Sequence, residues 1–81
     1  MVLKYPISTE KAVKAIEAEN KLTFVVDKRA TKKEIVDAFN EEFKIKPLSV
    51  NTQIKDNKKI AYIKLKPENP ALDIATRLGL M

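Results

Sequence analysis

Lysines are the residues of this 81-residue chain whose number and spacing most clearly predict chemistry. Between Lys44 and Lys66 the chain carries seven lysines and one acidic residue, Asp56, which gives a local net charge of +6. The whole chain carries +5, so the remainder sums to about −1. Ammonium groups concentrated in one segment attract phosphates, which predicts a site for a polyanion. The alternative is a solvated lysine face that only keeps the protein soluble.

Residue types that most enzyme mechanisms require are missing. Histidine and cysteine do not occur, which removes the commonest general base, the commonest metal ligand, the strongest nucleophile and any disulfide. The single glycine, Gly79, excludes glycine-rich phosphate-binding and dinucleotide-binding loops. Glu41 and Glu42 fit a solvated helix face, and Ser8 and Thr31 fit helix N-caps. We therefore expect no enzyme, no cofactor and no metal site.

Periodic apolar positions predict the elements that position the lysines in the first half of the chain. Residues 2–4 are predicted to form a short edge strand, and Ser8 or Thr9 caps a helix that runs to about residue 19. Residues 21–26 alternate as a strand with one buried face, made of Leu22, Phe24 and Val26.

Two further helices follow from capping signals. A capping box at Thr31 and Glu34 predicts a helix whose core stripe recurs every four residues, at Ile35, Phe39 and Phe43. Asn69 and Pro70 suit the N-cap and first turn of a last short helix, which Gly79 ends. Its inward side is predicted to consist of Ala71, Ile74, Ala75 and Leu78.

Two alternating strands between residues 48 and 65 predict a hairpin whose register follows from parity. The apolar face has even numbers in the first strand (Leu48, Val50, Thr52, Ile54) and odd numbers in the second (Ala61, Ile63, Leu65). Paired residues share a face, so the loop must contain an even number of residues. A two-residue turn at Asp56 and Asn57 meets this condition, because both tolerate positive φ. The opposite face then carries Ser49, Asn51, Gln53, Tyr62, Lys64 and Lys66, with Asn51 opposite Tyr62 and Val50 opposite Ile63.

The order strand, helix, strand, helix, strand, strand, helix predicts an α+β fold. We expect a split β-α-β sandwich, in which the last hairpin strand lies antiparallel between the two strands that the second helix joins. The sheet is small, mostly antiparallel and built of three to four strands, with helices packed on it. Residues 1–81 form a single domain, and the uncovered sheet face remains for a partner.

Four segments of the chain occur together in one order and spacing: "YPISTEKA" (residues 5–12), "ATKKEI" (30–35), "VNT" (50–52) and "KKIAYIKL" (58–65). This set closely resembles the family of the twenty-third protein of the large ribosomal subunit, in its archaeal form, over essentially the whole chain. The resemblance implies a structural constituent of that subunit that binds large-subunit rRNA near the exit of the polypeptide tunnel. It also implies a contribution to the platform on which nascent-chain factors dock.

The resemblance and the basic hairpin together predict the RNA contacts. Lysines would neutralise phosphates, and Asn51, Thr52 and Gln53 would form hydrogen bonds. Tyr62 either stacks on a splayed base or covers Ile60. Lysines at the start of the second helix oppose its dipole, which favours a partner there. The expected rRNA-binding residues are Lys4, Tyr5, Lys11, Lys28, Lys32, Lys33, Lys46, Asn51, Thr52, Gln53, Lys58, Lys59, Tyr62, Lys64 and Lys66.

Glu10 matches the acidic residue with which the family docks chaperones and the signal recognition particle, and it would also stabilise the first turn of its helix. The implied partners are large-subunit rRNA, neighbouring ribosomal proteins and the signal recognition particle or other exit-site factors. We expect a cytoplasmic, ribosome-bound location without membrane insertion, since no apolar run approaches the roughly 20 residues that span a bilayer. Bacterial members carry a long basic extension at the hairpin tip, whereas this tip is only residues 55–58, which argues against a tunnel-probing role.

Two hypotheses remain open from the sequence. The first is an RNA-anchored structural protein of the large subunit. The second is a free-standing split-βαβ protein-interaction or regulatory module whose lysines only provide solubility. The concentration of +6 on one hairpin favours the first, because a solubility surface does not need that segregation.

Overall fold

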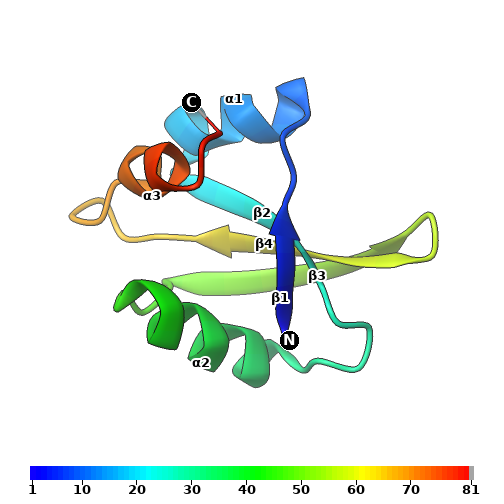
Figure 1. Ribbon diagram of the computed structural model, residues 1–81. Helices are drawn as coiled ribbons and strands as arrows, with labels where there is room; N and C mark the ends of the chain where they lie inside the picture. The colour runs from blue at the N-terminus through cyan, green and yellow to red at the C-terminus, as the bar shows by residue number, and fades with distance from the viewer. Residues whose placement is uncertain (81) are drawn as a thin grey trace.

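Residues 1–80, which the computed structural model describes, form three helices and one four-stranded antiparallel sheet (Figure 1). In chain order the elements are β1 (Leu3–Pro6), α1 (Glu10–Glu19), β2 (Lys21–Val26), α2 (Lys32–Phe43), β3 (Ser49–Lys55), β4 (Lys58–Lys64) and α3 (Ala71–Arg77). The strand order is β1-β2-β4-β3, with β4 antiparallel to both β2 and β3. The predicted α+β class and the place of the returning strand are therefore confirmed.

Local side-chain chemistry determines where α1 and α2 begin. Thr9 is the N-cap of α1, and its Oγ1 accepts a hydrogen bond from the N–H of Ala12 at 3.3 Å. Thr31 and Glu34 form the predicted capping box of α2, with reciprocal hydrogen bonds of 3.1 Å and 2.9 Å. Each cap satisfies N–H groups that the first helical turn leaves unpaired, so both starts follow from nearby residues alone.

The start of α3 instead depends on a residue distant in the sequence. Its N-cap is Pro70 rather than the predicted Asn69, and no side chain of its own segment caps it. The Oδ1 of Asn20 accepts a hydrogen bond from the N–H of Ala71 at 2.7 Å. The Nδ2 of Asn20 donates to the carbonyl oxygens of Leu65, Lys66 and Asn69 at 3.0–3.3 Å. One side chain at the end of α1 therefore holds the segment that joins β4 to α3.

All three helices pack on the same side of the sheet, which we call the helix face. Ile16 from α1, Phe39 from α2 and Ile74 from α3 lie in one core cluster with Phe24 and Ile63 of the sheet. The rings of Phe24 and Phe39 meet edge to face, with centroids 6.3 Å apart. Figure 1 shows α1 beside α3 and α2 along β3. Within the described residues, no helix has the length and apolar character needed to cross a membrane.

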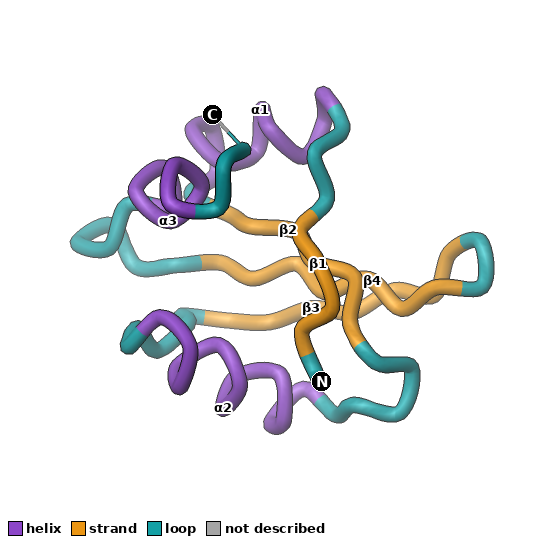
Figure 2. The backbone as a smooth tube through the Cα atoms, in the orientation of Figure 1, coloured by secondary structure: helices purple, strands orange, loops and turns teal. Residues whose placement is uncertain are grey.

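The hairpin has the register that parity predicts, with Val50 opposite Ile63. Its turn residues, Asp56 and Asn57, have positive φ values of 50° and 66°. The expectation of a buried apolar face is wrong at both ends of β3, because Leu48 is 54% exposed and Ile54 is 64% exposed. The hairpin tip extends past the helices (Figure 2), so no helix covers Ile54.

Strand β2 is buried on both faces, whereas the sequence predicted one buried face. Thr23 and Val25 point away from the helices, yet they are only 8% and 5% exposed. Their neighbours explain this burial: Val25 lies between Tyr5 of β1 and Ile60 of β4. The uncovered side of the sheet therefore has a small apolar centre.

Candidate nucleic-acid interface

The side of the sheet opposite the helices, which we call the open face, presents its side chains in rows across the strands. One end row contains Lys21, Lys64 and Ser49, and the other end row contains Lys58 and Lys55. Two middle rows lie between them and contain Thr23, Tyr62 and Asn51, and Tyr5, Val25, Ile60 and Gln53. The open face is thus a band of aromatic, apolar and polar side chains with lysines at both ends.

The lysine rows bring like charges together. Lys21 lies directly opposite Lys64, and Lys55 lies directly opposite Lys58. Directly opposed like charges destabilise a sheet. No strand position of the open face carries a carboxylate, although Glu19 at the end of α1 lies 3.2 Å from Lys21. Repulsion between these lysines does not stabilise the fold. Such a concentration of positive charge is expected on a surface that binds an anionic partner.

The turn end of the open face also receives basic residues from other segments. The Nζ of Lys28, in the loop between β2 and α2, donates to Oδ1 of Asn57 at 3.3 Å. The Nζ of Lys58 lies 5.9 Å from the centroid of the Tyr5 ring, across the space between the hairpin and β1. Lys28, Lys55 and Lys58 therefore gather at the tip.

A groove of about 630 Å³ lies on the open face between the hairpin and the loop from β1 to α1. Thr23, Val25 and Ile60 lie along its base, and Tyr5 and Tyr62 also line it. The hydroxyl of Tyr62 donates to Oε1 of Gln53 at 2.9 Å, which restrains the ring. The groove joins the middle rows of the face to the start of α1.

Two predicted RNA-binding residues lie on the helix face instead. Thr52 pairs with Ala61 and is half-buried. Lys59 pairs with Val26, and its Nζ donates to the carbonyl oxygen of Ala30 at 2.6 Å. Successive strand residues point to opposite faces, so the structure separates Lys59 from Lys58 and Thr52 from its neighbours on the open face.

The other predicted lysines lie at the ends of elements and are exposed: Lys4 in β1, Lys11 in α1, Lys32 and Lys33 in the first turn of α2, Lys46 before β3 and Lys66 after β4. Of these, Lys11 lines the groove. The charge of Lys4 affects the pKa of Asp27, the residue directly after β2. The N–H of Arg29 donates to Oδ1 of Asp27 at 2.9 Å and lowers the pKa of that carboxyl, and the charge of Lys4 lowers it further.

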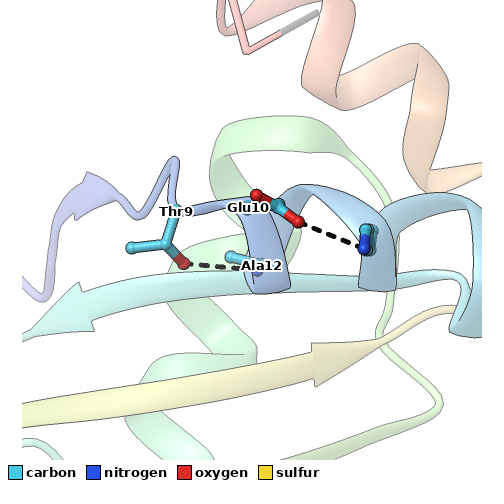
Figure 3. Close-up of polar contacts among 4 residues, drawn as sticks. Thr9, Glu10 and Ala12 are labelled. Atoms are coloured by element: carbon cyan, nitrogen blue, oxygen red, sulfur yellow. Dashed lines mark hydrogen bonds and ion pairs between the residues drawn. The ribbon is translucent and has the colours of Figure 1, made fainter.

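Glu10 lies at the exposed start of α1 (Figure 3). Its Oε1 is 3.2 Å from the Nζ of Lys14, one turn further on, and both side chains are largely exposed. Exposed pairs of this kind contribute only about 0.3–0.5 kcal/mol. The carboxylate is therefore readily accessible to a partner. The described residues contain no group of three or more Asp and Glu side chains placed to share a metal ion.

Sequence reasoning missed Lys21 and Lys55 as members of the open face. A signal for both was present, because Lys55 directly precedes the turn and Lys21 has the same parity as Thr23 and Val25. The apolar base of the groove had no such signal, since Val25 is covered by residues from other strands. Tyr5 was predicted, but its place beside Lys58 was not.

The chain is similar in sequence to known ribosomal proteins. The chain is 46% identical over 81 residues to "Large ribosomal subunit protein uL23" of Trypanosoma brucei brucei. That alignment covers 99% of this chain and 49% of the relative, so the chain spans about half the length of the curated relative. The family model for ribosomal protein L23 matches residues 1–70, which include the whole sheet, α1 and α2. The chain therefore belongs to the ribosomal protein L23 family.

Proposed function

We propose that this chain is a structural, non-catalytic constituent of the large ribosomal subunit that binds large-subunit rRNA through its open face, near the exit of the polypeptide tunnel. The observation that carries the proposal is the segregation of the two faces. The strand positions of the open face hold four lysines and no carboxylate, while the main apolar core cluster lies on the helix side. Family membership supports this hypothesis over a free-standing interaction module.

The rows of the open face suggest how RNA would lie on it. Lys58 and Lys64 are six residues apart in β4, which corresponds to about 20 Å along a strand. Lysines at that spacing can neutralise phosphates at two separate points of a folded RNA. Asn51 and Gln53, between them, can form hydrogen bonds to 2′-hydroxyl groups.

Sedimentation with ribosomes tests the proposal. The tagged chain should travel with large subunits through a moderate-salt wash, and a Lys58→Ala, Lys64→Ala double variant should be released at lower salt. Lys14→Ala, a charge-removing change on the helix side, should remain bound like the unmodified chain. Recovery of the unmodified chain only at the top of the gradient would contradict the proposal.

The expected protein partners attach to a different part of the molecule. We place neighbouring ribosomal proteins and exit-site factors such as the signal recognition particle on the helix side and at Glu10, in a cytoplasmic, ribosome-bound setting. Glu10→Gln should weaken factor docking on assembled ribosomes and leave the rRNA affinity of the free chain unchanged. Equal docking by both forms would remove Glu10 from the docking surface.

A further inference from the structure

We infer that the groove on the open face receives an unpaired base of the RNA partner, beside the lysines that bind phosphates. The inference rests on the proposed function, since it assumes that the open face binds RNA. It adds the chemical class of the occupant, a nucleotide whose base has left its helical stack.

The base of the groove is more apolar than phosphate binding requires. Val25 is only 5% exposed although it points away from the helix face, and Ile60 lies beside it in β4. Phosphate contacts are made by charged and polar groups and draw no benefit from such a surface. The groove volume of about 630 Å³ is typical of pockets that bind small organic groups.

Two aromatic rings line this apolar base. Tyr5 of β1 pairs with Val25, and Tyr62 of β4 pairs with Thr23, so the rings come from different strands and adjacent rows. Tyr5 is 46% exposed, and Tyr62 is restrained by its hydrogen bond to Gln53. Aromatic side chains on an uncovered four-stranded sheet are a known means of stacking unpaired RNA bases.

The rim of the groove favours a nucleotide over an apolar side chain of a neighbouring protein. Lys11, Lys55 and Lys58 line it, against one acidic residue, Asp56. The Nζ of Lys58 is 5.9 Å from the Tyr5 ring centroid, close to the limit at which a cation interacts with a ring. This ammonium can turn to a phosphate when a base stacks on Tyr5.

Two probes with equal phosphate content isolate the contribution of the base. Hexaadenylate should bind the chain at least about fivefold more tightly than an abasic ribose-phosphate hexamer, which corresponds to stacking of one base. Tyr5→Leu together with Tyr62→Leu should bring this ratio close to one, whereas Tyr→Phe at both positions should keep it. Lys64→Ala should weaken both probes equally and leave the ratio unchanged. Tyrosine ring proton resonances of the unmodified chain should shift with hexaadenylate and not with the abasic hexamer.

Each other outcome has a definite meaning. Equal affinity for the two hexamers overturns the inference and leaves the proposed function intact. If the chain binds neither hexamer and does not bind rRNA, the proposed function itself is contradicted. A ratio that survives the double leucine variant overturns the inference by placing the base elsewhere. The inference is also overturned if the double leucine variant binds rRNA normally but is lost from assembled subunits. That result would indicate that the groove receives an apolar side chain of a neighbouring protein. Melting curves of the leucine and phenylalanine variants check that both fold.

Discussion

The two faces of the sheet are built from the same strands but from opposite kinds of side chain. On the helix face, Leu22, Phe24 and Ile63 are buried in a core shared by three helices. On the open face, Lys21 and Lys64 occupy positions next to these residues in the sequence and point the other way. Because successive side chains of a strand point to opposite faces, one strand supplies apolar residues to the core and lysines to the open face.

This contrast between the faces shows which lysine charges stabilise the fold. Lys59 points to the helix face and donates to the Ala30 carbonyl oxygen, so its charge supports the structure. Lys58 points to the open face, opposite Lys55, where its charge opposes the structure. Adjacent lysines in one basic segment therefore have different roles, and the following substitutions test that division in order of expected effect.

The largest effect is expected at Ile63, which is fully buried on the helix face. Ile63→Ala should lower the free energy of unfolding by about 2–5 kcal/mol, because truncation leaves a cavity between β4 and the helices. Lys64→Ala, the next residue, should change it by no more than about 0.5 kcal/mol and reduce RNA affinity instead. Denaturant unfolding and an RNA-binding titration measure the two quantities. The reverse pattern would mean that the two faces have been exchanged.

A smaller loss of stability is expected at Asn20, whose side chain joins α1, β4 and α3. Asn20→Gly keeps a residue that tolerates the φ of 52° but removes all four side-chain hydrogen bonds. The free energy of unfolding should fall by roughly 1–3 kcal/mol, because the buried N–H of Ala71 loses its acceptor. RNA affinity of the folded protein should stay constant, since the contact lies away from the open face. Unchanged unfolding would show that water replaces the amide.

The adjacent pair Lys58 and Lys59 provides the sharpest comparison of the faces at constant charge. Lys59→Ala should reduce the free energy of unfolding by roughly 0.5–1.5 kcal/mol, the usual value of one hydrogen bond, with little change in the salt dependence of RNA binding. Lys58→Ala should leave stability nearly unchanged and flatten the plot of log affinity against log salt by about one phosphate contact. Identical slopes for the two variants would disprove the separation of their roles.

The smallest expected effect is a gain in stability. Lys64→Glu places a carboxylate opposite Lys21 and replaces repulsion with attraction. The free energy of unfolding should rise by about 0.2–1 kcal/mol, while RNA affinity should fall further than in Lys64→Ala. Thermal melting of the free protein compares the unmodified chain, Lys64→Ala and Lys64→Glu. A loss of stability in Lys64→Glu would indicate that the open-face lysines do not repel one another.

Residue order alone determined most of the scaffold of this protein. The parity of Val50 and Ile63 and the turn at Asp56 and Asn57 set the hairpin register, because a slip of one residue would exchange the two faces. The caps at Thr9 and Thr31 act within three residues, so their geometry is present in the sequence itself. The basic character of the open face followed from the same alternation.

Tertiary structure alone decided the features that join distant segments. Asn20 caps a helix 51 residues further on, Lys59 finds its acceptor at Ala30, and Tyr5 meets Lys58 across the groove. The exposure of Ile54 and the burial of Val25 likewise depend on where helices end and which strands are neighbours. The alternation of polar and apolar residues specifies which way a side chain points, but it carries no information on what lies there. The neighbours of each side chain are determined only when distant segments of the chain come into contact.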